Sequence, residues 1–398
     1  LLLSYEARSA ADTEGRWGDV VLRFQQFTGP LMAKGLEDTL MYGYLPLLSA
    51  NEVGGAPDRL GVTAREFHRA ARDLAKMHPR SMTTSSTHDT KRGEDTRLRI
   101  DAITHHLDEW THGVRLWRRL HRDLRRRVTG SAAPDANDEY LVYQTIVGVL
   151  TGGAIVDEQT SERLREYLLK SLREAKRHTS WTNQNDAYEQ AALDYLDGVL
   201  EGLRDERSDF AASLGGFLGT IDATHEVIAL SHQVVRLTMP GVPDTYRGAE
   251  LLDLTLVDPD NRRPVDWDLR IRLVSAGTPT DAGELGARKL ALLKRLLHLR
   301  RDNPHLFLEG EYVPLHVVGD EPESLVAYAR TRGTDIAIIV ARRTAGALSS
   351  SSRLQLPYEL SEGEYEEILT GTPVSVEDAT IDLSALLTAE PAAVLRRR

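Results

Sequence analysis

The sequence contains no cysteine among its 398 residues. Disulfide frameworks, thiolate catalysis and zinc–sulfur sites are therefore excluded. It also contains no run of about 18 apolar residues, so we expect no membrane-spanning segment. The opening Leu1-Leu2-Leu3 is too short for a signal peptide and lacks a basic flank. We expect a cytoplasmic protein whose chemistry comes from carboxylates, histidine, lysine, arginine and hydroxyls.

The chain also has no excess of positive charge. The 49 lysines and arginines are outnumbered by 60 aspartates and glutamates, which gives a formal net charge of −11. Because nucleic-acid-binding surfaces need clustered cations, we expect no nucleic-acid partner and no membrane partner. The basic run over 115–127 is predicted as a helix, and in an acidic chain it indicates a solvated face.

Neither a cofactor nor a metal is expected. The segment 258–261, Asp-Pro-Asp-Asn, resembles the start of a calcium loop. It lacks the third ligand and the glycine of an EF-hand, so it indicates a turn.

Glycine and proline are too few for a low-complexity chain, at 30 and 16 residues, and the hydrophobic content of 41% excludes disorder. At about 150 residues per domain, the length predicts two or three domains. The patterning changes along the chain. Helical periodicity with charged faces dominates from residue 94 to about residue 230, and short strand-like segments dominate after residue 303.

Several elements have local signals. Thr63-Ala64-Arg65-Glu66 has the form of a capping box and predicts a helix over 67–77. A leucine stripe predicts another helix over 289–301. Apolar and β-branched segments predict strands over 28–35, 81–87, 234–239, 324–329, 336–341, 354–356 and 365–369.

The segment 86–92, Ser-Thr-His-Asp-Thr-Lys-Arg, carries the strongest chemical signal. It follows a predicted strand, and in a barrel the carboxyl ends of strands point into the site. His88 can donate to a sugar hydroxyl, and Asp89 can stabilise the positive charge of an oxocarbenium-like transition state. Alternatively, Asp89 forms an Asx turn or caps a helix that continues through Glu94 and Asp95. The pair alone favours this second interpretation.

The surroundings favour the first interpretation. The segment resembles the fourth conserved region of the α-amylase clan, and with Lys91-Arg92-Gly93-Glu94-Asp95-Thr96-Arg97 it resembles the maltooligosyl trehalose synthase family. Further stretches resemble that family in the same order along nearly the whole chain. They are 25–39, 48–55, 173–176 with 179–181, 240–244 and 258–265.

The resemblance implies an α/β fold: the last strands of an amylase-type (β/α)₈ barrel, a large helical insertion and a C-terminal all-β domain. Residues 1–94 would hold strands six and seven of the barrel. Residues 95–229 would form the insertion, 230–303 strand eight and the final barrel helix, and 304–398 the β domain.

The resemblance also implies a reaction. The family converts the reducing-end α-1,4 bond of a maltooligosaccharide into an α,α-1,1 bond, so maltooligosaccharide is the implied substrate. Both bonds are α, and retention needs a carboxylate nucleophile and a general acid about 5–5.5 Å apart. The family's Arg-x-Asp and following Glu regions, which supply these groups, precede every stretch that matches here, and no stretch of residues 1–398 resembles them. We therefore expect a C-terminal portion that is inactive alone, with the N-terminal barrel portion as its partner.

The resemblance assigns roles residue by residue. Asp89 would be the catalytic transition-state stabiliser. The substrate-binding residues would be His88, Lys34, Glu37, Lys91, Arg92, Arg262 and Arg263.

Simpler interpretations stay open. Lys34 and Glu37 could form a local ion pair on a loop, and Arg262 and Arg263 could be solvated loop charges. Glu37, Asp38 and Glu52 are available carboxylates, but the resemblance does not make any of them the nucleophile or the acid. The alternatives for the whole chain are another α-amylase-clan glucanotransferase or hydrolase, and a non-catalytic glucan-binding protein.

Overall fold

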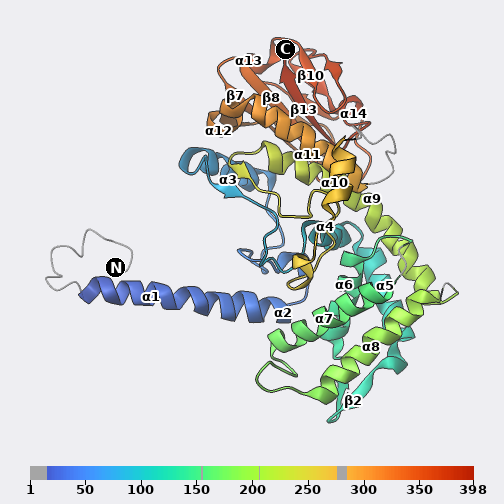
Figure 1. Ribbon diagram of the computed structural model, residues 1–398. Helices are drawn as coiled ribbons and strands as arrows, with labels where there is room; N and C mark the ends of the chain where they lie inside the picture. The colour runs from blue at the N-terminus through green and yellow to red at the C-terminus, as the bar shows by residue number, and fades with distance from the viewer. Residues whose placement is uncertain (1–15, 154–155, 206, 276–284) are drawn as a thin grey trace.

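The computed structural model describes residues 16–153, 156–205, 207–275 and 285–398 (Figure 1). The Leu1-Leu2-Leu3 start lies outside these residues. Helices dominate up to residue 309 and strands dominate from residue 311 onward, so the fold is mixed, with a sheet-rich C-terminal region. In the described residues, no helix combines the length and the hydrophobicity that crossing a membrane requires.

The N-terminal segment is helical. Helix α1 spans Arg16–Met32 and projects from the body of the molecule in Figure 1. It continues as a π-helix over Ala33–Leu40, and α2 over Met41–Gly43 follows. The strand predicted over 28–35 is therefore wrong. Val20, Phe24, Phe27 and Leu31 recur at spacings of three and four, which is the period of a helix and not of a strand.

Helix α3 confirms the predicted capping box. It spans Ala64–Met77, the Thr63 hydroxyl accepts from the Glu66 amide at 3.2 Å, and the Glu66 carboxylate accepts from the Thr63 amide at 2.9 Å. Strand β1 follows, but it covers only Met82–Thr83 of the predicted 81–87.

Strand β1 pairs in parallel with β4, Val242–Pro243, with Met82 opposite Val242 and Thr83 opposite Pro243. The strand predicted over 234–239 is wrong, because that segment ends the 30-residue helix α9 and β4 begins only after it. Val234 and Leu237 are completely buried one turn apart on this helix, so packing overrides the β-propensity of the valines.

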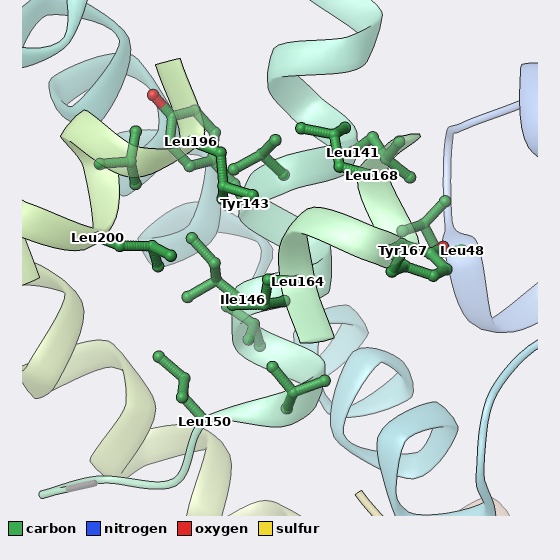
Figure 2. Close-up of a cluster of buried hydrophobic side chains, with 14 of the residues drawn as sticks. Leu48, Leu141, Tyr143, Ile146, Leu150, Leu164, Tyr167, Leu168, Leu196 and Leu200 are labelled. Carbon is green, nitrogen blue, oxygen red and sulfur yellow. The ribbon is translucent and has the colours of Figure 1, made fainter. Parts of the chain in front are cut away.

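Helices fill the region between the two parallel strands. They are α4 (Glu94–Ala102), α5 (Leu107–Leu120), α6 (Ala136–Val149), α7 (Glu158–Ala175), α8 (Asp186–Arg204) and α9 (Asp209–Thr238). Figure 2 shows Tyr143 and Ile146 of α6 packed with Leu164 of α7 and Leu196 of α8. The helix predicted over 115–127 ends at Leu120, and a hairpin follows, formed by β2 (Arg126–Val128) and β3 (Ser131–Ala133).

The C-terminal region has two antiparallel sheets. The six-stranded sheet runs β11-β10-β13-β8-β7-β5, and the three-stranded sheet runs β12-β9-β6. The strands are β5 (Glu311–Pro314), β6 (His316–Val318), β7 (Leu325–Arg332), β8 (Asp335–Arg342), β9 (Arg353–Gln355), β10 (Tyr365–Glu367), β11 (Thr372–Val374), β12 (Thr380–Asp382) and β13 (Ala392–Arg397). The short strands predicted from the sequence are confirmed.

Helices connect this sheet to the rest of the molecule. They are α10 (Trp267–Ser275), α11 (Leu285–Asp302) and α12 (Pro304–Glu309), with the short α13 (Tyr358–Ser361) and α14 (Leu383–Leu386) near the C-terminus. The predicted leucine-striped helix is confirmed as α11. One face of the sheet packs on α9 and α11 through Leu237, Leu296 and Tyr328. Helix α9 runs through the predicted boundary at 229/230 and so joins the helical core to the sheet core.

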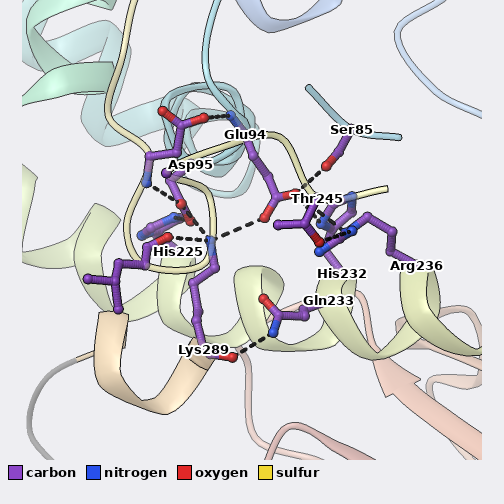
Figure 3. A network of polar contacts seen from close by, with 12 residues as sticks. Ser85, Glu94, Asp95, His225, His232, Gln233, Arg236, Thr245 and Lys289 are labelled. Carbon is purple, nitrogen blue, oxygen red and sulfur yellow. Dashed lines mark hydrogen bonds and ion pairs between the residues drawn. The ribbon is translucent and has the colours of Figure 1, made fainter. Parts of the chain in front are cut away.

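A buried charge cluster holds the start of α4 (Figure 3). The Lys289 ammonium, fully buried on α11, lies 3.1 Å from Glu94 Oε1 and 2.6 Å from Asp95 Oδ2. The His225 ring of α9 lies 3.1 Å from Asp95 Oδ1, and the Asp253 amide donates to Asp95 Oδ2 at 2.7 Å. Three distant segments therefore meet at the first turn of α4.

The attraction within the cluster outweighs desolvation. Burial disfavours all three charges, yet the Lys289 ammonium lowers the pKa of Glu94 to about 2 and also lowers the pKa of Asp95. The two carboxylates in turn raise the pKa of Lys289. All three groups are therefore charged at neutral pH. Removing any one of them would leave a buried charge without its partner and lower the stability of the fold.

We predict that Lys289→Met lowers the free energy of unfolding by about 3–5 kcal/mol, because two buried carboxylates lose their cation. Urea denaturation followed by circular dichroism measures this. Lys294→Met on the same helix is the control, since the Lys294 ammonium donates to the exposed Val274 carbonyl, at 3.1 Å, and is paired with no carboxylate among the described residues. Its effect should stay within about 0.5 kcal/mol. Equal stability of the two variants would contradict the role of Lys289.

The lowered pKa of Glu94 also predicts acid sensitivity. The carboxylate contributes stability above its ordinary pKa of 4.5, and that contribution is lost as pH falls toward the folded-state pKa of about 2. Denaturation curves between pH 5 and about 2 should show a steeper loss of stability for the wild type than for Lys289→Met. Parallel pH profiles would show that the pair does not carry the effect.

Candidate functional site

His88 and Asp89 lie on an exposed turn between β1 and α4. The Thr87 hydroxyl accepts from the Asp89 amide at 3.1 Å, and the Thr90 hydroxyl donates to the Thr87 carbonyl at 2.9 Å. Helix α4 begins at Glu94 with Gly93 at its N-cap, so the alternative that Asp89 caps this helix is wrong. The Asp89 carboxylate is therefore free of that task and faces solvent.

Glu52 fixes the backbone that follows this turn. Its carboxylate is buried and accepts from the Lys91 amide at 2.8 Å and the Arg92 amide at 3.3 Å. The Arg92 side chain, 1% exposed, donates to the Leu48 carbonyl at 3.0 Å and the Tyr167 hydroxyl at 2.6 Å. The Arg92 guanidinium is therefore buried and bonded to the protein, where it supports the turn, and its contact with substrate stays a prediction.

The π-helix Ala33–Leu40 lies beside this turn. Asp38 joins two lysines: its Oδ2 is 2.5 Å from the Lys34 ammonium, and its Oδ1 is 2.9 Å from the Lys91 ammonium. Burial raises the pKa of Asp38, but the two lysines outweigh it and the pKa is lowered. Lys91 is 3% exposed and its ammonium is held by Asp38, and its role as a substrate ligand stays a prediction.

Lys34 remains accessible. The pKa of Lys34 is raised, chiefly by its hydrogen bond to Asp38, and the charges of Glu174 and Asp89 add to this. Asp89 is therefore within electrostatic reach of Lys34. The local ion pair considered for Lys34 exists, but with Asp38 on a helix, and not with Glu37 on a loop. Glu37 Oε1 instead lies 3.4 Å from the Gly54 amide.

The loop with Arg262 and Arg263 contacts the same turn. The Asn261 amide group donates to the His88 carbonyl at 3.2 Å. The loop is held by Arg163 of α7, whose guanidinium forks onto Asp260 with both contacts at 2.9 Å. Arg263 also pairs with Asp260 at 2.9 Å.

Arg262 is the more available of the two loop arginines, since half of its side chain is exposed and Asp258 is 3.8 Å away. Asp258 also accepts from Lys170 at 2.7 Å. The predicted turn at 258–261 is confirmed as a 3-10 helix over Asp260–Arg262, and its carboxylates are bonded to cationic side chains.

The structure thus exposes His88 and Asp89 on a turn that the loop of Arg262 contacts through Asn261. Lys91, next along the chain, is joined through Asp38 to the accessible Lys34. Sequence reasoning missed Glu52, Asn261 and Arg163, which fix the turn and its neighbouring loop. Glu52 and Asn261 lie in stretches that carry the family resemblance, but no local signal indicates their partners. The exposed carboxylate of Asp89 suits a ligand that develops positive charge during a reaction. The accessible cationic side chains of Lys34 and Arg262 can donate to the hydroxyls of a neutral ligand.

Comparisons with known proteins show what the chain as a whole is similar to. No family model matches. Two curated Mycobacterium tuberculosis proteins, from strains CDC 1551/Oshkosh and H37Rv, bear the provisional name maltooligosyl trehalose synthase. Each is 38% identical to the chain over 370 residues, which are 93% of this chain and 45% of the relative.

Solved structures match as well. The maltooligosyltrehalose synthase of Arthrobacter ramosus is 34% identical, with a TM-score of 0.80, over 96% of this chain and 47% of that one. A hypothetical maltooligosyl trehalose synthase from Sulfolobus tokodaii is 29% identical, with a TM-score of 0.76, over 97% and 48%.

In sequence and in fold, the chain is similar to enzymes that are named as trehalose-forming synthases. These relatives are the maltooligosyl trehalose synthases, which confirms the resemblance seen in the sequence. The chain spans about half the length of the relatives that it matches.

The arrangement predicts unequal roles for two nearby aspartates. Asp260→Ala leaves the mostly buried Arg163 without its partner and should cost about 3 kcal/mol of unfolding free energy. Asp258→Ala is the matched control, because its ion pairs are more exposed and should cost less than about 1 kcal/mol. Chemical denaturation measures the unfolding free energy of both variants. An equal loss in the two would contradict the role of Asp260 in holding the loop.

Proposed function

We propose that this chain supplies the transition-state-stabilising carboxylate and part of the sugar pocket of a maltooligosyl trehalose synthase. The reaction is an intramolecular transglucosylation that converts the reducing-end α-1,4 bond of a maltooligosaccharide into an α,α-1,1 bond. The observation that carries the proposal is the exposed Asp89 on a turn fixed by Glu52 and Asn261, within electrostatic reach of Lys34.

The chemistry proceeds by two displacements. The bond between the anomeric carbon and O4 breaks as a carboxylate attacks that carbon, and a general acid gives its proton to O4. The freed glucose then turns and its anomeric hydroxyl attacks the glycosyl–enzyme carbon, so that the bond between that carbon and the carboxylate breaks. The residue that acted as the acid now takes the proton of the attacking hydroxyl. Asp89 stabilises the positive charge that develops in both transition states. The nucleophile and the acid are proposed to come from the part of the relatives that this chain does not match.

The other site residues have binding roles in this proposal. His88 donates to a hydroxyl of the glucosyl unit that carries the developing charge. Lys34 and Glu37, on the π-helix, and Arg262 and Arg263, on the loop, hold the freed glucose while it turns. Water has to be excluded at that stage, because it would hydrolyse the covalent intermediate.

The proposal extends to the fold. Strands β1 and β4 are the seventh and eighth strands of an amylase-type barrel, and α4 to α9 form most of the insertion between them. Their parallel pairing supports this, as does the position of the Asp89 turn after the carboxyl end of β1. The remaining barrel strands are the proposed partner of this chain.

A chimera tests the function. The chain is joined, in one polypeptide, to the part of the Mycobacterium tuberculosis relative that it does not match, and maltopentaose is supplied. We expect loss of reducing ends with a trehalose-terminated product, and no turnover by the chain alone. Glucose release without that product would favour a hydrolase. Glucan binding without any turnover by the chimera would favour a non-catalytic binding protein.

In the chimera, we predict that Asp89→Asn lowers kcat at least about a hundredfold, with a smaller change in KM, because it removes charge and keeps shape. Asp73→Asn, an exposed position on α3, is the control and should leave both constants unchanged. Initial rates over a range of maltopentaose concentrations measure both. Full activity of Asp89→Asn would remove Asp89 from the chemistry.

A further inference from the structure

Trp181 has no role in the chemistry above, yet it is half exposed, at 50%. It lies on the connection between α7 and α8, and burying so large an apolar ring would be favourable. Trp181 therefore offers a large apolar ring for contact with a ligand.

The loop holds its shape through its own hydrogen bonds. The Ser180 amide donates to the Asn183 carbonyl at 3.1 Å, and the Asn183 amide donates to the Ser180 hydroxyl at 3.0 Å. At its base, the Thr179 hydroxyl accepts from the Asn185 amide at 3.0 Å. Trp181 therefore sits at the tip of a closed turn and needs little ordering to bind a ligand.

One face of the indole ring is backed by a fixed cation. The Arg173 guanidinium lies 5.0 Å from the ring centroid. Arg173 is forked onto the buried Glu189, at 2.9 and 2.7 Å, and Glu189 also accepts from Thr179 at 2.5 Å. Because one carboxylate anchors both the arginine and the base of the loop, the ring has a rigid support on one side and exposed area for contact.

The polar groups beside the ring are neutral. Thr182, Asn183 and Gln184 follow Trp181 and are all exposed. Hydroxyl and amide groups both donate and accept, as vicinal sugar hydroxyls require, and they do not select for charge. A flat apolar ring flanked by amides fits the apolar C–H face of a pyranose and its equatorial hydroxyls.

This loop adjoins the candidate site. It follows the C-terminal end of α7, where the Lys176 ammonium donates to the Thr39 hydroxyl at 2.9 Å, next to Asp38. Glu174, on the same turn of α7, contributes to the raised pKa of Lys34. An oligosaccharide that occupies the site can therefore extend onto the loop.

We propose that Trp181 is a sugar-binding platform that stacks on a glucose residue of an α-1,4-glucan. The identity of the sugar rests on the proposed function, whereas the platform itself is complete within the described residues. Its contribution is to affinity and to the preferred chain length, since Trp181 makes no contact with the reacting atoms.

The test uses this chain alone and maltoheptaose, titrated by isothermal calorimetry. We expect Trp181→Ala to weaken binding at least about tenfold and Trp181→Phe to keep most of it, because a smaller ring still stacks. Trp267→Ala is the matched control. Trp267 is 53% exposed and lies 5.8 Å from the Arg270 guanidinium, but on α10 it is flanked by Asp266 and Asp268. The Trp267→Ala substitution should leave maltoheptaose binding unchanged.

The inference is overturned if Trp181→Ala binds as the wild type does, if Trp267→Ala loses as much affinity, or if the wild-type chain does not bind maltoheptaose. None of these results depends on turnover by the chimera, so failure of the platform and failure of the proposed function are distinguishable. Equal melting temperatures of the wild type and Trp181→Ala would establish that lost affinity is not lost folding.

Discussion

The buried ammonium of Lys289, between Glu94 and Asp95, is the interaction on which the rest of the structure depends. It fixes the first turn of α4 against α9 and α11, and the turn with Asp89 lies immediately before α4. A buried ion pair adds little net stability over an apolar equivalent, but breaking one side is costly. Such a cluster therefore specifies one arrangement, and here that arrangement presents Asp89 to solvent.

Each segment next to that cluster is held by its own polar contact. Glu52 binds the backbone of the turn, Asp38 joins Lys34 to Lys91, and Arg163 holds the loop of Asn261 through Asp260. The side chains that remain exposed are those suited to a sugar. Preorganisation of this kind is what electrostatic stabilisation of a transition state requires, because the charges need not move as the reaction proceeds.

The elements that could be predicted from the sequence are those with a local signal. The capping box at Thr63, the leucine stripe of α11 and the short C-terminal strands all form as expected, because each depends on neighbours in the chain. The strands expected over 28–35 and 234–239 are helical, since a short apolar segment does not distinguish the two periods. The burial of Arg92 and Lys91 could not be predicted, because residue type gives no measure of burial. Their partners, like those of Lys289 and Asn261, lie 38 to 195 residues away in the sequence.

A cationic sugar analogue tests the role of Asp89 most directly. In the chimera, the inhibition constant of a protonated imino sugar such as 1-deoxynojirimycin should rise at least about tenfold in Asp89→Asn, because the charge it pairs with is gone. The inhibition constant of neutral maltose should change little. An equal effect on both ligands, or none on the imino sugar, would contradict the claim that Asp89 stabilises developing positive charge.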